Sequence, residues 1–208
     1  MRNEFTRNME VKDRFIKRYE EGFMPWAHSE PDFNLIEMVQ NWPIKVCKTA
    51  EIGCGTGTDA IWLTSQKFNT TAIDSSAVAI DIAKENARKE KSNCHFDVCD
   101  FMTENIEGAP FDFIFDRGFF HSFDTLSDRK IFAERVSKAL TEKGLWLSLI
   151  GSSDDLPRKR GNGPPQRSAQ EIIKAAEPYF KILSLSVSFF GSESERPAKI
   201  WVCLMRKR

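Results

Sequence analysis

A glycine-rich stretch, residues 51–57 with the sequence Glu-Ile-Gly-Cys-Gly-Thr-Gly, has the residue types and spacing to hold a ligand. It follows a short apolar run and precedes an amphipathic segment, so it is predicted to join a β-strand to a helix. Glycine lets the backbone turn sharply and lets a ligand approach closely. The free N–H groups at the start of the next helix then face that ligand. The stretch therefore predicts a site for a small molecule that carries a ribose.

An acidic residue lies at the distance from this loop that a ribose site requires. Asp74 ends the second predicted strand, about 20 residues beyond the glycines, where a carboxylate accepts both hydrogen bonds of a ribose diol. Read from Gly55, the spacing Gly55-x-Gly57-x-x-Ala60 is a variant of the dinucleotide-binding fingerprint. Both NAD and S-adenosylmethionine fit these features.

Three further features favour S-adenosylmethionine. Glu51 adds negative charge beside the loop, which repels a pyrophosphate and attracts a sulfonium and an ammonium. Asp100 and Phe101 follow the third predicted strand, where an acid accepts from an adenine amino group and a ring lies against the base. The chain also ends in a predicted antiparallel hairpin, which a second mononucleotide-binding half would not supply.

The elements that position these residues alternate between strand and helix from residue 45 onward, which predicts a parallel sheet with right-handed crossovers. Five strands are expected first, and a connection too short for a parallel crossover then joins the last two as a hairpin. The expected strands are residues 46–52, 69–74, 94–98, 111–116, 145–150, 182–190 and 199–205.

Helices are expected between these strands and before them. Two precede the first strand and are predicted to form an N-terminal cap, with residues 10–41 acting as a lid over the site. Side chains that satisfy free N–H groups mark several helix starts, among them Asp32, Ser75 or Ser76, and the capping box of Ser168 with Glu171. The expected helices are residues 10–21, 32–41, 59–66, one after Ser76, one ending near Gly144 and one from Ser168.

Composition limits the classes of protein that this chain can be. Its 208 residues predict one domain, in which residues 1–44 form the cap and residues 45–208 the ligand-binding core. Thirty basic and thirty acidic residues give no net charge to attract nucleic acid, and no apolar run is long enough to cross a membrane. The five cysteines form no Cys-x-x-Cys pair, which favours reduced thiols in a cytoplasm over disulfides or a metal site.

On these residues the sequence resembles the class I S-adenosylmethionine-dependent methyltransferases, whose first motif is very close to residues 51–57. The resemblance covers about residues 45–208. It implies an α/β, Rossmann-like sheet of seven strands in the order 3-2-1-4-5-7-6, with strand 7 antiparallel and helices on both faces. Pro25-Trp26, residues 116–121 and residues 163–165 are similar to the branch that methylates small molecules, such as the thiopurine, thiol, halide and tellurite methyltransferases.

The resemblance also implies roles for individual residues. The glycines would face the methionine moiety of the cofactor, Asp74 the ribose, Asp100 and Phe101 the adenine, and Trp26 would help to cover the cofactor. The cofactor-binding set is Trp26, Glu51, Gly53, Cys54, Gly55, Thr56, Gly57, Asp74, Ser75, Asp100, Phe101 and Asp116. The acceptor is expected between the cap, residues 117–123 and residues 151–167, against Arg117, Phe119 and Phe120.

The implied reaction is a direct in-line displacement, which needs no nucleophile from the enzyme and no metal. A thiol or soft anion requires no general base, whereas for an alcohol, amine or phenol His121 is the candidate base. Two alternatives stay open: methylation of RNA or protein, and a non-catalytic module that binds S-adenosylmethionine. An NAD-dependent oxidoreductase is a more distant one.

Overall fold

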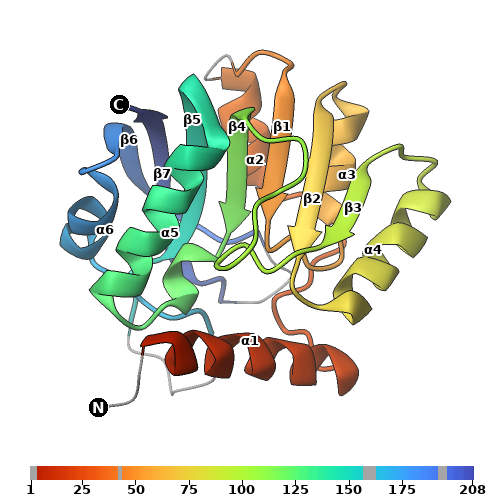
Figure 1. Ribbon diagram of the computed structural model, residues 1–208, viewed down its shortest axis with the longest axis horizontal. Helices are drawn as coiled ribbons and strands as arrows, with labels where there is room; N and C mark the ends of the chain where they lie inside the picture. The colour runs from red at the N-terminus through yellow and green to blue at the C-terminus, as the bar shows by residue number, and fades with distance from the viewer. Residues whose placement is uncertain (1–3, 42–43, 157–162, 192–195) are drawn as a thin grey trace.

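The computed structural model describes residues 4–41, 44–156, 163–191 and 196–208, of which residues 4–10 are described by their backbone. One sheet of seven strands runs through it in the order β3-β2-β1-β4-β5-β7-β6, as expected (Figure 1). Strands β1 to β5 are parallel, and β7 is antiparallel to both of its neighbours. The strands are β1 Lys48–Ile52, β2 Asn69–Asp74, β3 His95–Val98, β4 Phe111–Arg117, β5 Leu140–Gly151, β6 Phe180–Phe189 and β7 Lys199–Lys207.

Helices cover both faces of the sheet because its central strands are apolar on both sides. On one face Phe132 of α5 and Ile172 of α6 pack against Trp146 of β5. On the other, Leu35 of α2 and Leu63 of α3 pack in a cluster with the aromatic side chains of β4. The helices are α1 Glu4–Glu20, α2 Phe33–Asn41, α3 Thr58–Ser65, α4 Ala77–Lys89, the short 3-10 helix η1 Phe120–Ser122, α5 Leu126–Ala139 and α6 Ala169–Ala176.

The predicted helix caps are confirmed. The Asp32 carboxylate accepts from the backbone N–H of Asn34 at the start of α2, and the Ser76 hydroxyl accepts from Ala79 at the start of α4. Ser168 and Glu171 form the full capping box of α6. Each cap satisfies N–H groups that the first turn of a helix leaves without partners.

The boundary between α5 and β5 differs from the prediction. Gly144 was expected to end the helix, but α5 ends at Ala139 and β5 begins at Leu140. The pairing register explains the difference, because Phe111 pairs with Leu140 whereas Phe113 pairs with Leu145. Gly144 therefore lies in a β-bulge, where glycine is also common.

The two N-terminal helices do not form one lid. Helix α1 runs across the edge where the parallel strands end, whereas α2 lies behind the sheet, against its face (Figure 1). Leu35 of α2 is fully buried in the cluster on that face. The expected lid of residues 10–41 is thus corrected to α1 and the segment that follows it. Among the described helices, none is long and apolar enough to cross a membrane.

Candidate functional site

Helix α1 and the carboxyl ends of the parallel strands enclose a cavity of about 1040 Å³. Glu51 of β1, Asp74 of β2 and Arg117 of β4 reach it from the sheet, and Tyr19 reaches it from α1. Ligands of open α/β sheets bind at this edge. Ligand pockets measure about 300–1,000 Å³, so this cavity is at the upper end of the range for a small-molecule site.

The glycine loop lines one half of the cavity. Gly53 and Gly55 have φ angles of 71° and 54°, in the left-handed region that favours glycine. A Cβ on Gly55 would lie 2.8 Å from the Tyr19 hydroxyl, and one on Gly53 would lie 2.7 Å from the Phe119 ring. The absence of side chains therefore keeps space that the cap and the β4 loop would otherwise lose.

Gly57 has a different role from the other two glycines. It does not line the cavity, and a Cβ there would lie 2.8 Å from the Phe96 ring and 2.9 Å from Ala83. The expectation that Gly57 contacts a cofactor is therefore replaced by a packing role at the start of α3. Cys54 and Thr56 of the loop do line the cavity, and so does Ser75, which follows β2.

Asp74 holds the loop in place. Its carboxylate accepts from the backbone N–H of Gly55 at 3.1 Å and from that of Ser76 at 2.9 Å. Burial raises the pKa of Asp74, and these backbone N–H groups partly offset the rise. Because each carboxylate oxygen accepts more than one hydrogen bond, Asp74 can hold the loop and still accept from a diol in the cavity.

Glu51 is a buried carboxylate of the site with an unsatisfied oxygen. Its side chain is 2% exposed and lines the cavity, and its Oε2 accepts no hydrogen bond from any residue that the structure describes. Burial, and then the neighbouring Asp59, raise the pKa of Glu51 well above its usual value, while Arg117 lowers it. A buried carboxylate without a partner is costly. A cation in the cavity would supply the missing partner.

Asp100 and Phe101, which the sequence predicts to flank an adenine, have different surroundings. Asp100 accepts from the Lys12 ammonium of α1 at 3.1 Å, so it also joins the cap to the core. Phe101 is 3% exposed and packs edge-on against Phe132, with centroids 5.8 Å apart. Both residues line the cavity.

Trp26 reaches the cavity together with a residue that the sequence did not single out for the site. Its indole Nε1–H donates to the Tyr19 hydroxyl at 2.9 Å, and its ring packs edge-on against Phe15 and Tyr19. These aromatic side chains close the cavity beside the glycine loop. The 3.6-residue spacing of Phe15 and Tyr19 predicted an amphipathic helix, but it did not indicate what the apolar face would cover.

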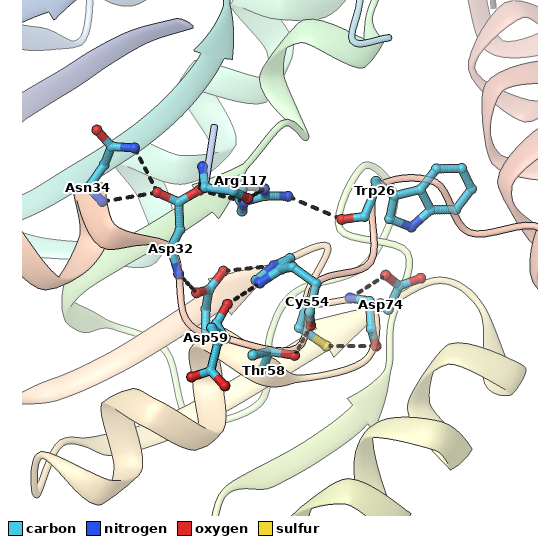
Figure 2. Close-up of polar contacts among 12 residues, drawn as sticks. Trp26, Asp32, Asn34, Cys54, Thr58, Asp59, Asp74 and Arg117 are labelled. Atoms are coloured by element: carbon cyan, nitrogen blue, oxygen red, sulfur yellow. Dashed lines mark hydrogen bonds and ion pairs between the residues drawn. The ribbon is translucent and has the colours of Figure 1, made fainter. Parts of the chain in front are cut away.

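A buried ionic network joins the segment after α1 to the sheet (Figure 2). One oxygen of Asp32 accepts from the Arg117 Nε–H at 2.9 Å and from Gly191 N–H at 3.1 Å, and the other accepts twice from Asn34. The backbone N–H of Asp32 donates to Asp59 at 2.8 Å. The sequence identified Asp32 only as a helix cap, because its other partners are more than 25 positions away.

Arg117 was expected to contact substrate, and its guanidinium is instead held largely by the protein. Besides Asp32, it donates to the carbonyl oxygens of Trp26 at 3.2 Å and Gly191 at 2.9 Å. The guanidinium carbon also lies 4.6 Å from the centroid of the Phe190 ring. Arg117 still lines the cavity, so it contributes positive charge there from a fixed position.

His28 adds a second link between the N-terminal segment and α3. Its Nε2 lies 3.4 Å from the buried Asp59 carboxylate, and its carbonyl accepts from the Thr58 hydroxyl. These contacts fix the segment that carries Trp26 to α3, and the hydrogen bond from Arg117 to the Trp26 carbonyl fixes it to β4.

Two predicted contacts are replaced by structural roles, because the side chains face away from the cavity. Asp116 is fully buried and accepts from the Phe120 N–H and from the Trp146 indole, at 3.1 and 2.8 Å. Burial raises the pKa of Asp116 to about 6. Phe120 is likewise fully buried, against Phe132 and Trp146. Of the aromatic pair expected to meet the acceptor, only Phe119 lines the cavity.

The hydrogen bonding of His121 does not suit the expected general base. The backbone N–H of Gly151 donates to its Nδ1 at 2.9 Å, so the lone pair of that nitrogen is engaged. Burial, and then the positive charges of Arg167 and Arg117, lower the pKa of His121 to about 3. A group that resists protonation in this way is a weak proton acceptor at neutral pH.

Arg167 is a further residue near the site that sequence reasoning missed. Its guanidinium donates to the carbonyl oxygens of His121 at 2.7 Å and Phe123 at 2.8 Å, and it lies 3.6 Å from the Asp124 carboxylate. It fixes the loop after β4 from a position more than 40 residues away. Only its place at the end of the polar loop of residues 151–167 could have drawn attention to it. Residues 157–162 of that loop lie outside the described residues.

Comparison with known proteins shows what the chain is similar to. Residues 50–144 match the model of a family described as a methyltransferase domain. A protein named "Probable thiol methyltransferase 2" from Arabidopsis thaliana is 27% identical over 175 residues, which cover 81% of this chain and 74% of that protein.

Two solved structures show that the fold is shared over almost the whole chain. One bears the description "Conversion of a Disulfide Bond into a Thioacetal Group during Echinomycin Biosynthesis". Its TM-score is 0.79 and its sequence identity 21%, and the match covers 95% of this chain and 93% of that one. The other is the Burkholderia thailandensis 1,6-didemethyltoxoflavin-N1-methyltransferase with bound S-adenosylhomocysteine, with a TM-score of 0.76, 16% identity and coverage of 100% and 91%.

Together these findings support an S-adenosylmethionine-dependent methyltransferase with small-molecule methyltransferases among its structural neighbours. The residues of the cavity fit this cofactor. The unpartnered oxygen of Glu51 suits a cation, and Asp74 and the glycine loop suit a ribose and the chain attached to it.

Proposed function

We propose that this protein transfers a methyl group from S-adenosylmethionine to the sulfur atom of a small thiol. The observation that carries the donor half of the proposal is the buried Oε2 of Glu51, which accepts no hydrogen bond within the described part of the chain. Two observations support the acceptor half. The hydrogen bonding and burial of His121 and Asp116 do not suit a general base, and a relative is named as a thiol methyltransferase.

The bound cofactor supplies a methyl group on a positively charged sulfur. Glu51 would hold the cationic methionine end, Asp74 the ribose hydroxyls, and Asp100 with Phe101 the adenine. Fixing two reactants in line contributes up to about 7–11 kcal/mol to the lowering of a barrier. Asp74 fixes the glycine loop and Asp32 fixes Arg117, so hydrogen bonds within the protein hold both walls of the site.

The choice of a thiol follows from the surroundings of Asp116 and His121, the titratable groups nearest the expected acceptor. Asp116 is fully buried and does not line the cavity, and the Nδ1 lone pair of His121 is engaged by Gly151. An alcohol keeps its proton at neutral pH, whereas a thiol with a pKa of about 8.5 ionises to a useful extent without help. The thiol proton then leaves to solvent, and a sulfur lone pair forms the new S–CH₃ bond while the electrons of the broken bond stay on the donor sulfur.

The cap contributes by excluding water. Phe15, Tyr19 and Trp26 cover the cavity with aromatic surface, and Lys12 ties α1 to Asp100. A thiolate that has lost part of its hydration shell reacts faster than one in bulk water.

The test is calorimetric titration with S-adenosylhomocysteine and, separately, with NAD. We expect micromolar binding of S-adenosylhomocysteine alone, weakened more than about 100-fold in Asp74→Ala because two charge-assisted hydrogen bonds are lost. Asp81→Ala, an exposed acid on α4, is the matched control and should bind as the native protein does. Binding of NAD instead would make the protein an oxidoreductase.

A second assay addresses the acceptor. Purified protein is supplied with S-adenosylmethionine and a panel of thiols, phenols and amines, and S-adenosylhomocysteine is quantified. Transfer to thiols at rates well above those for phenols of the same shape is expected. Faster transfer to the phenols, or transfer to RNA or protein alone, would contradict the acceptor assignment, and binding without turnover would indicate a regulatory module.

A further inference from the structure

The tautomer of His121 is fixed by its surroundings. The N–H of Gly151 is a donor only, so the Nδ1 atom that it contacts at 2.9 Å must carry a lone pair and no proton. A neutral imidazole with a bare Nδ1 carries its proton on Nε2. That Nε2–H has no hydrogen-bond partner among residues 4–41, 44–156, 163–191 and 196–208, and the side chain lines the cavity.

The His121 ring is held firmly. Arg167 binds its backbone carbonyl, and the Phe190 ring packs edge-on against the imidazole with centroids 6.1 Å apart. A Cβ on Gly118 would lie 3.0 Å from Nε2, so glycine at this position leaves the ring room beside β4. The donor therefore has a defined position at the cavity wall.

The charges around His121 are opposite in sign to those of the cofactor half. Arg117 from β4 and Arg167 from the start of α6 both act on the imidazole and favour its neutral form. Their acidic partners are Asp32, which is buried against Arg117, and Asp124, whose side chain is 66% exposed near Arg167. Glu51, Asp59 and Asp74 lie with the glycine loop. The cavity thus has an acidic half and a half with a free donor, and Arg117 lies between them, since it also lowers the pKa of Glu51.

We infer that the Nε2–H of His121 donates a hydrogen bond to the anionic sulfur of the acceptor and so selects thiolates over neutral nucleophiles. This inference rests on the proposed function. It makes His121 a hydrogen-bond donor to the acceptor, whereas a general base would take a proton from it. The donor stabilises the ionised thiol in the site and aims its sulfur. Phe119 and Phe123 on the same wall favour an acceptor with an aromatic or other apolar body.

Two amide substitutions separate the two nitrogens of the ring. His121→Asn places an amide near the Nδ1 position, where it can still accept from Gly151 but cannot reach the place of Nε2. His121→Gln extends its amide to the Nε2 position and restores a donor there. Thermal unfolding of both variants establishes that they are folded.

Binding of thiophenol to the protein saturated with S-adenosylhomocysteine is the main readout, with phenol as the neutral comparison. We expect His121→Asn to weaken thiophenol binding about 10- to 100-fold, as the loss of a charge-assisted hydrogen bond implies, and phenol binding only slightly. His121→Gln should recover most of the loss. Both variants should bind S-adenosylhomocysteine as the native protein does.

The pH dependence and the nitrogen NMR of His121 give independent readouts. Because the imidazole stays neutral, kcat/KM should follow the ionisation of the thiol and shift when a thiol of different pKa is used. The ¹⁵N spectrum should show a protonated Nε2 and a bare Nδ1.

Unchanged thiophenol binding in a folded His121→Asn that still binds S-adenosylhomocysteine would overturn the inference. So would a pH profile that stays fixed when the thiol is changed. Failure of the native protein to bind S-adenosylhomocysteine, or to methylate any thiol, would instead refute the proposed function.

Discussion

The two halves of the cavity are built from the chain in different ways. The acidic half comes from one strand–turn–helix unit and the end of the next strand, all within residues 51–75. The half around His121 is assembled from segments far apart in the sequence, through Arg117 with Asp32 and Arg167 with the carbonyl oxygens of residues 121 and 123. A short sequence motif therefore supplies the groups of the first half, whereas long-range hydrogen bonds position those of the second.

Two buried carboxylates of the site, Asp32 and Glu51, also differ in how well their oxygens are satisfied. Asp32 accepts four hydrogen bonds from protein donors, whereas Glu51 keeps an oxygen without one in the described chain. A satisfied buried network stabilises a particular arrangement, and an unsatisfied group is ready for a ligand. The comparison suggests that stability is concentrated around Asp32 and ligand binding around Glu51.

The largest expected effect comes from breaking the satisfied network. Asp32→Ala leaves the Arg117 guanidinium buried without its carboxylate, and should lower the free energy of unfolding by about 3–5 kcal/mol. Urea unfolding measures this, with Asp81→Ala as the exposed control. A loss below about 1 kcal/mol would mean that the network adds little to stability.

Substitution of Glu51 should have the opposite sign in the cofactor-free protein. Because burial raises the pKa of Glu51 in the fold, the unfolded chain loses this proton first, from about pH 4.3 upward. The stability tied to this group is present below that pH and is lost as pH rises toward the folded pKa.

Glu51→Gln removes the ionisable group and with it this pH-dependent loss of stability. We expect the free energy of unfolding to rise by about 1–3 kcal/mol at pH 8 and to change little near pH 4. Binding of S-adenosylmethionine should weaken at least about 10-fold, because the cation loses its carboxylate. A variant that is less stable at pH 8, yet binds the cofactor normally, would contradict the comparison of the two halves.

The smallest effect concerns the cap. Trp26→Phe keeps the aromatic packing but removes the hydrogen bond from Nε1 to Tyr19, so S-adenosylhomocysteine should bind about 2- to 10-fold more weakly. Tyr19→Phe removes the same bond from its other side and serves as the matched variant. If the bond matters as proposed, the double variant should bind no more weakly than the weaker single variant.

Prediction from sequence succeeded where local rules decide the structure. The residues 69–74 strand, the caps at Ser76 and Ser168 and the antiparallel hairpin depend on neighbours in the chain, and all agree with the structure. Gly144 was misplaced because glycine suits both a helix end and a β-bulge. The pairing partner Phe113, 32 residues away from Leu145, decides between them.

The roles of the site residues were likewise predictable where local structure decides them, and not where distant contacts do. Gly53, Gly55, Asp74 and Glu51 reach the cavity because the strand ends and the glycine turn dictate it, and the sequence alone predicted this. The sequence did not distinguish Asp116 and Phe120, which face the core, from Arg117 and Phe119, which reach the cavity. Asp116 and Arg117 are neighbours in β4 and point to opposite faces. Phe119 and Phe120 follow the strand at the start of η1, where packing against the rest of the fold decides which ring is buried.

The sequence by itself determined the order of the elements and the glycine loop, because glycine conformation, capping and apolar periodicity act over a few residues. Its resemblance to the methyltransferases implied the class of chemistry. Only the tertiary structure decided which part of the N-terminal segment covers the site, which carboxylate has a free oxygen and which nitrogen of His121 carries a proton. Those properties belong to contacts between distant segments, whose geometry is set by packing of the whole sheet and its helices.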